Sequence, residues 1–172
     1  MMRKLQFTFV VAAILLLMLW LITLFLPSEI SLFRSVRVDV NRQRVVEQVS
    51  NFKNWSNWYP AFRDSSVSVS ISQKADTSFA TIVDKESDKK ITFALLNSSN
   101  DSIKILLPAN DERYLFVIKT ISNAQTELTW FIDVHLGQYP WKKFGGIFYD
   151  KVNGEKYASV LSDLKYYLET TH

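Results

Sequence analysis

The chain has no cysteine, two histidines and four glycines among 172 residues. Without cysteine there is no disulfide framework, no thiolate nucleophile and no thiolate metal ligand. His135 is the one histidine away from the chain end, and it falls on the polar face of an expected strand. We therefore interpret it as a surface residue and expect no zinc site. The chain also lacks a G-x-S-x-G nucleophile motif and a glycine-rich phosphate loop. We accordingly expect no metal and no cofactor.

The chain has little excess of charge of either sign. The chain contains 20 Lys and Arg residues and 17 Asp and Glu residues, which gives a net charge of +3. Two of the positive charges, Arg3 and Lys4, lie at the N-terminal tip. The rest of the chain therefore offers no electrostatic footprint for nucleic acid, which we do not expect as a partner.

A long uncharged apolar segment occupies residues 7–26, FTFVVAAILLLMLWLITLFL. As a helix these 20 residues span roughly 30 Å, the thickness of a hydrocarbon core. The sequence predicts a single-pass membrane protein with four parts: a cytoplasmic tip (1–6), a transmembrane helix (7–26), a linker (27–30) and one folded domain (31–172).

Two other interpretations of this segment are weaker. A core helix of a soluble protein would carry a polar face, which these residues lack. A cleaved signal peptide has a shorter apolar run and a small-x-small cleavage site, whereas Leu24, Phe25 and Leu26 are large. The positive-inside rule places Arg3 and Lys4 in the cytoplasm and the domain outside, although the nearby basic residues at 34 and 37 weaken this bias.

The middle of the chain shows the two-residue period of β-strands. Residues 35–40 form a first strand, and residues 42–52 an amphipathic helix that Asn41 caps. An aromatic segment around Trp55 and Trp58 follows and stops at Pro60. Six further strands, separated by short polar breaks, indicate an antiparallel meander; they occupy residues 67–71, 79–83, 91–96, 102–107, 113–122 and 126–136.

A long helix closes the chain. Tyr157, Val160, Leu161, Leu164 and Leu168 recur with helical spacing and form one apolar face. A sheet with one apolar face must bury it against another element. The predicted fold is therefore α+β: a seven-stranded antiparallel sheet wrapped around the C-terminal helix and preceded by one transmembrane helix.

Four segments along the chain carry a pattern that is found together in one superfamily. They are the first strand and helix (36–41, Val45), the aromatic segment (54–55, Trp58, Pro60), the last strand (126–130) and the closing helix (Gly154, Tyr157, Leu161, Leu164, Lys165, Glu169). In this order they resemble the START-like, or helix-grip (SRPBCC), superfamily, and in particular its polyketide cyclase/dehydrase-like branch. The resemblance covers residues 31–169, without the anchor. It implies a hydrophobic ligand held between the sheet and the C-terminal helix. Some domains of this superfamily are cyclases or aromatases, and others are lipid carriers.

The first half of the closing helix suggests where a cavity lies. Extending its apolar face backwards meets Gly154, Asn153, Asp150 and Gly146, which are small or polar and leave room beside the sheet. The alternative is that the helix starts later, or bends at the paired glycines, so that residues 144 and 148, both phenylalanine, fill the space. Both interpretations stay open at this point.

The candidate ligand contacts combine this stretch with the aromatic segment and the inward faces of the strands. The aromatic segment has other possible roles, in the core or at the bilayer surface. Asp150 is a weak candidate for a catalytic acid or base and has an equally simple role as a solvated helix residue. The full set is Trp58, Tyr59, Phe93, Phe116, Ile118, Trp130, Ile132, Val134, Gly146, Asp150, Asn153 and Gly154.

These features favour one function over two alternatives. The favoured function is membrane-anchored binding of a hydrophobic small molecule or lipid, without chemistry. The alternatives are a cyclase or dehydratase acting on an apolar substrate and a non-catalytic scaffold that contacts another membrane protein. The sequence leaves the ligand's identity and the oligomeric state open.

Overall fold

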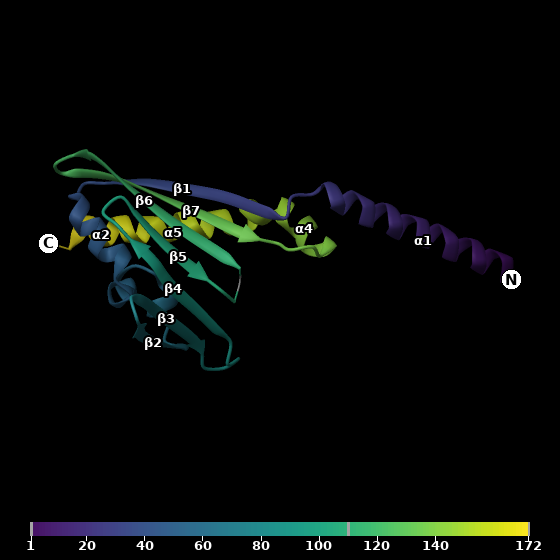
Figure 1. Ribbon diagram of the computed structural model, residues 1–172, viewed down its shortest axis with the longest axis horizontal. Helices are drawn as coiled ribbons and strands as arrows, with labels where there is room; N and C mark the ends of the chain where they lie inside the picture. Colours follow the sequence, from purple (N-terminus) through teal and green to yellow (C-terminus); the bar gives the residue numbers. More distant parts are fainter. Residues whose placement is uncertain (1, 110, 172) are drawn as a thin grey trace.

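The computed structural model describes residues 2–109 and 111–171. A long helix precedes a seven-stranded sheet, and two consecutive helices close the chain (Figure 1). The elements in order are α1 Met2–Phe25, β1 Glu29–Val38, α2 Arg42–Ser50, the 3-10 helix η1 Phe52–Asn57, α3 Pro60–Arg63, β2 Val67–Lys74, β3 Thr77–Asp84, β4 Lys90–Ser98, β5 Ser102–Leu107, β6 Glu112–Ser122, β7 Gln125–His135, α4 Pro140–Ile147 and α5 Tyr149–Thr170.

The sheet is antiparallel throughout, with strand order β1-β7-β6-β5-β4-β3-β2. Strands β2 to β7 form the meander that the two-residue period predicts, and β1 pairs with β7 at the edge of the sheet. Ile30 of β1 pairs with Val134 of β7, and Glu112 of β6 pairs with the same residue. These three residues therefore lie at one end of the sheet.

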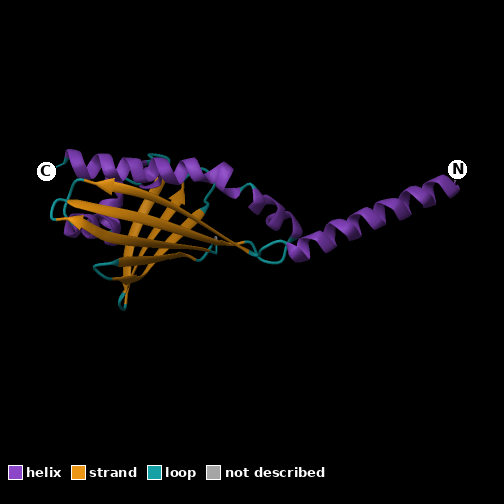
Figure 2. Cartoon of the chain, turned by 90° about the horizontal axis from the view of Figure 1, so that it is seen from above, coloured by secondary structure: helices purple, strands orange, loops and turns teal. Residues whose placement is uncertain are grey.

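Helix α5 lies across one face of this sheet (Figure 2). Its predicted apolar face is buried, and so is the inward face of β7, where Leu128, Trp130 and Ile132 have no exposed surface. The helix-grip architecture expected from the sequence is thus confirmed.

The helical segment after β1 covers a further part of that face. The Asn41 side chain accepts a hydrogen bond from the backbone N–H of Arg44, as predicted for the N-cap of α2. The indole of Trp55 in η1 is fully buried, and its Nε1–H donates to the carbonyl oxygen of Val49 at 2.9 Å. That carbonyl lies in the last turn of α2, where it has no partner within the helix. Trp55 therefore joins two successive helices while filling the core.

Most strand ends differ by a few residues from the expected ranges, and two differences are larger. Strand β1 begins at Glu29, inside the expected linker, because the sheet pairing with β7 continues to His135. The closing helix is broken at Phe148, between α4 and α5. Phe144 is half-buried and Phe148 is exposed, so neither phenylalanine becomes a core residue.

Helix α1 extends away from the domain (Figure 1). Within the described residues, Gln6–Phe25 is one helix long and apolar enough to cross a membrane, by length and composition alone. Its mean hydropathy is 2.7, and only 6% of the most apolar window is buried. The charge-free segment of the sequence is therefore helical and leaves its apolar side chains uncovered.

Candidate ligand-binding pocket

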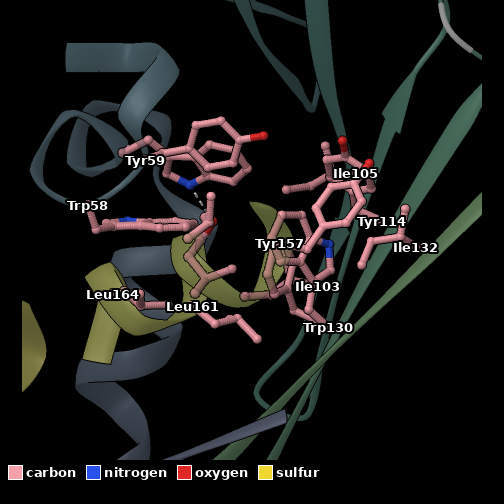
Figure 3. Packing of buried hydrophobic residues seen from close by; sticks show 14 of the residues in the cluster. Trp58, Tyr59, Ile103, Ile105, Tyr114, Trp130, Ile132, Tyr157, Leu161 and Leu164 are labelled. Atoms are coloured by element: carbon pink, nitrogen blue, oxygen red, sulfur yellow. Dashed lines mark hydrogen bonds between the residues drawn. The ribbon is translucent and has the colours of Figure 1, made fainter. Parts of the chain in front are cut away.

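A pocket of about 410 Å³ opens between α3, α5 and the sheet. Its wall is formed by the start of α3, by one side of α5 between Tyr149 and Val160, and by residues at the ends of β2 to β6. The volume lies within the range of small-molecule sites. Tyr59 reaches from the helical segment with its hydroxyl pointing toward the sheet residues Ile105 and Tyr114 (Figure 3).

The position of α5 explains why this space is open. Polar contacts fasten α5 to the edge strand β1: Arg34 pairs with Asp150, and Lys165 Nζ donates to the carbonyl oxygen of Arg37 at 2.6 Å. The backbone N–H of Asp39 also donates to Glu169 Oε1 at 2.9 Å. Because the helix is held along β1, strands β3 to β6 are not fully covered at the end where α5 begins.

Most of the pocket wall is apolar. Ile82, Phe93, Leu107 and Val160 are buried around it. Val67 and Ile91 are half-buried on its sheet side. Such a wall suits the hydrocarbon part of a ligand, since burying apolar surface contributes about 25 cal/mol per Å².

One end of the pocket carries a hydrogen-bonded polar cluster. The hydroxyl of Tyr114 donates to Glu112 Oε2 at 2.9 Å, and the hydroxyl of Tyr149 lies 3.4 Å from Glu112 Oε1. The hydroxyls of Tyr149 and Tyr157 are 3.1 Å apart. Asn153 Nδ2 donates to the carbonyl oxygen of Tyr149 at 3.2 Å. We call Glu112, Tyr114, Tyr149 and Tyr157 the Glu112 cluster.

Burial keeps the phenols of this region protonated. It is the largest cause that raises the pKa of Tyr59, Tyr114, Tyr149 and Tyr157 above the ordinary value. For Tyr149 the hydrogen bond with Tyr157 and the charge of Glu112 raise the pKa further. The tyrosine hydroxyls are therefore neutral near pH 7 and can donate hydrogen bonds to Glu112 or to a ligand.

Charged and small residues surround the mouth. Lys89 and Lys156 are exposed there, and Asp84 is half-buried. Ala61 and Ser159 line the opening with little side-chain bulk and are exposed. The mouth of the pocket is therefore lined by charged side chains and by two small residues.

Three of the residues proposed from the sequence line this pocket: Tyr59, Phe93 and Asn153. Val134 is buried at the end of β7, where it pairs with the pocket residue Glu112 but does not itself line the pocket. Five others are fully or almost fully buried in the core beneath it, namely Trp58, Phe116, Ile118, Trp130 and Ile132. For Trp58 this placement matches the core role considered for the aromatic segment.

The small and polar residues expected to border a cavity, Gly146, Asp150 and Gly154, lie on the side of α4 and α5 that faces β1, and they do not line the pocket. Asp150 is exposed and pairs with Arg34, whose Nε also donates to the carbonyl oxygen of Gly154 at 3.2 Å. A Cβ atom on Gly154 would meet the Arg34 guanidinium, and one on Gly146 would meet Leu136 and Ile30. These glycines let α4 and α5 approach β1 closely, so the space expected beside Asp150 is occupied by side chains from β1 and from the end of β7.

Sequence reasoning missed the Glu112 cluster. Glu112 falls in the polar break between the expected strands 102–107 and 113–122, although it shares a strand face with Tyr114 two residues later. Tyr149, Asn153 and Tyr157 recur at four-residue spacing on one face of α5. These two regularities were the available signals.

A metal centre is a poor fit. In the two described ranges, 2–109 and 111–171, no group of three His, Cys, Asp or Glu side chains is placed to hold a metal ion. His135 is exposed, as expected for a surface histidine. Its Nδ1 lies 3.3 Å from Oε1 of Glu29 at the end of the sheet.

Comparison with known proteins shows similarity at the level of the fold. No family model and no curated protein matches the sequence. Solved structures do match. One is a protein from Thermobifida fusca, with a TM-score of 0.62, 14% identity, and coverage of 83% of this chain and 97% of the other.

Two further matches carry descriptive names. An AHSA1-like protein from Aeromonas hydrophila has a TM-score of 0.54 at 10% identity, covering 82% of this chain and 98% of that one. The di-domain ARO/CYC protein StfQ of the steffimycin biosynthetic pathway has a TM-score of 0.60 at 9% identity, covering 81% of this chain but only 50% of that protein. At these identities the similarity shows the helix-grip fold alone.

Proposed function

We propose that this protein binds an apolar small molecule or lipid in the pocket between α3, α5 and the sheet, while α1 anchors it in a membrane. The observation that carries the proposal is a 410 Å³ pocket with an apolar wall and one hydrogen-bonding end. Apolar lining with a few placed polar groups is the usual form of a small-molecule site. The fold shared with an ARO/CYC protein supports a pocket of this kind in this architecture.

The pocket chemistry narrows the ligand class. Its apolar wall favours a hydrocarbon or fused-ring body, and the Glu112 cluster favours one polar group at the inner end. Glu112 accepts hydrogen bonds from Tyr114 and Tyr149, one on each carboxylate oxygen. Because each of these oxygens can accept a further bond, a ligand hydroxyl or amine that donates to Glu112 fits better there than a second carboxylate. We therefore infer a largely apolar, neutral or cationic ligand.

The anchor belongs to the same proposal. An exposed helix of Gln6–Phe25 with this hydropathy is suited to lipid and would be unfavourable in water. With basic residues at 3 and 4, the positive-inside rule puts the N-terminus in the cytoplasm and the domain outside. Only residues 26–28 separate α1 from β1, so the pocket stays close to the bilayer from which an apolar ligand could come.

A second candidate function is cyclase- or dehydratase-type chemistry on such a ligand. The specific observation in its favour is the placement of Glu112 and Tyr149 on an apolar pocket, where a carboxylate and a neutral phenol can act as base and acid. Asp150 is not part of this arrangement, because it pairs with Arg34 outside the pocket.

Mass spectrometry of the full chain extracted from its membrane tests the binding proposal. The expected result is one compound, or one narrow class, enriched several-fold over its share of the total membrane lipid extract. Recovery of lipids in the same proportions as the membrane, with no added apolar compound raising the melting temperature, would overturn the proposal.

A further inference from the structure

Helix α4 and its flanks present large apolar side chains to the outside. Trp141 is 68% exposed and Phe148 is 60% exposed, and Tyr139 and Ile147 are also more than half exposed. We call Tyr139, Trp141, Ile147 and Phe148 the α4 surface. A cluster of this kind is uncommon on a protein surface that faces only water.

The α4 surface lies next to the end of the apolar helix α1, at the junction seen in Figure 1. The ammonium of Lys143 in α4 is buried and donates to the carbonyl oxygens of Thr23 at 3.1 Å and Leu26 at 3.2 Å. Carbonyl groups in the last turn of a helix lack intrahelical partners, and a cation there is favourable. Lys143 therefore fastens α4 to the point where α1 ends.

The composition of this region fits a lipid headgroup layer. Tyr139 and Trp141 stack with ring centroids 5.0 Å apart, and Lys142 Nζ lies 5.7 Å from the centre of the Tyr139 ring. No acidic residue occurs between positions 134 and 149 of the sequence. Tryptophan and tyrosine are enriched at membrane interfaces, and lysine is attracted to anionic lipids.

We propose that the α4 surface rests in the headgroup layer of the same bilayer that α1 spans. The inference relies on the proposed anchor, since α1 sets the height of α4. The domain then has two contacts with the bilayer, one through the spanning helix and one at the interface. Together they fix the orientation of the domain relative to the membrane plane. Tyr149 follows Phe148 directly, so the polar end of the pocket lies beside the lipid headgroups.

Spin labelling tests this contact, and the natural chain contains no cysteine to interfere. Trp141→Cys and Phe148→Cys each introduce one label on the α4 surface. Tyr166→Cys is the matched control, because Tyr166 is 71% exposed at the far end of α5. Leu17→Cys marks the middle of α1. The full-length variants are placed in nanodiscs of three parts phosphatidylcholine to one part phosphatidylglycerol, and collisions with oxygen and with a water-soluble nickel chelate are measured.

The expected result is that labels at 141 and 148 meet the nickel chelate several-fold less often than the label at 166. If position 17 is shielded but 141 and 148 are as accessible as 166, the α4 contact is overturned and the anchor stands. If position 17 is itself accessible to the chelate, the proposed anchor fails, and the α4 contact fails with it.

Discussion

Arg34 and Asp150 form an ion pair that joins the edge strand β1 to the first turn of α5. It lies on the outside of the domain, and Asp150 remains more than half exposed. The contact holds α5 along β1, which leaves the pocket open on the other side of the helix. The residue that the sequence suggested as a weak catalytic candidate thus makes one of several contacts that hold α5 along β1.

Replacing Asp150 by Asn should change ligand binding little. Exposed ion pairs contribute about 0–1 kcal/mol to stability, and Asp150 does not line the pocket. Glu112→Gln, by contrast, removes a charge at the pocket end. With N-phenyl-1-naphthylamine as a fluorescent apolar probe of the full chain, we expect Glu112→Gln to weaken binding several-fold and Asp150→Asn to leave it within about twofold. Equal effects of the two variants would contradict this assignment.

Stability should fall at alkaline pH. An unperturbed tyrosine ionises near pH 10, whereas burial raises the pKa of Tyr59, Tyr114, Tyr149 and Tyr157 in the folded protein. Above pH 10 the unfolded chain therefore loses protons that the folded chain keeps, so the free energy of unfolding decreases as pH rises.

Urea unfolding at about pH 9 and about pH 11 measures this loss. Tyr149→Phe should reduce it, because one of the contributing hydroxyls is absent. A free energy of unfolding that is unchanged, or higher, at the more alkaline pH would contradict the burial of these phenols.

The two buried indoles Trp55 and Trp130 should respond differently to replacement by Phe. Both are fully buried, so the loss of volume is the same. The Nε1–H of Trp55 donates to Val49, whereas that of Trp130 has no hydrogen-bond partner among the described residues. Trp55→Phe leaves a buried carbonyl unpaired and should cost about 1–3 kcal/mol more than Trp130→Phe. Chemical denaturation of both variants measures the difference, and equal losses would contradict the account.

Lys143 should control how firmly the domain is attached to α1. Lys143→Met removes its two hydrogen bonds to the end of the helix. Lys151→Met is the control, because Lys151 is exposed on α5. With spin labels at Leu19→Cys and Tyr166→Cys, the distance distribution should broaden in Lys143→Met and stay narrow in Lys151→Met. Identical distributions in both variants would contradict a fastening role for Lys143.

Much of the fold could be predicted because periodicity reports burial directly. The alternation in residues 126–136 and the helical spacing from Tyr157 to Leu168 each identify one buried face, and both faces meet in the structure. Asn41 could be identified as a cap because capping depends on local contacts alone.

The pocket could be predicted only in part, because its location depends on how α5 is placed across the sheet. Small residues at Gly146 and Gly154 suggested empty space, but Ile30, Leu136 and Arg34 fill it. Arg34 and Gly154, for example, are 120 positions apart in the sequence. No local pattern in the sequence reports such a contact.

The central claim is that the pocket carries an apolar ligand, and a pair of tryptophan variants tests it most directly. Ser159 is exposed and lines the mouth, whereas Ser162 is exposed on the same helix and does not line the pocket. Native mass spectrometry of full-length Ser159→Trp and Ser162→Trp compares how much co-purifying compound each retains. We predict that Ser159→Trp loses most of it while Ser162→Trp keeps the amount found with the unmodified chain. Equal retention by both variants would contradict the claim.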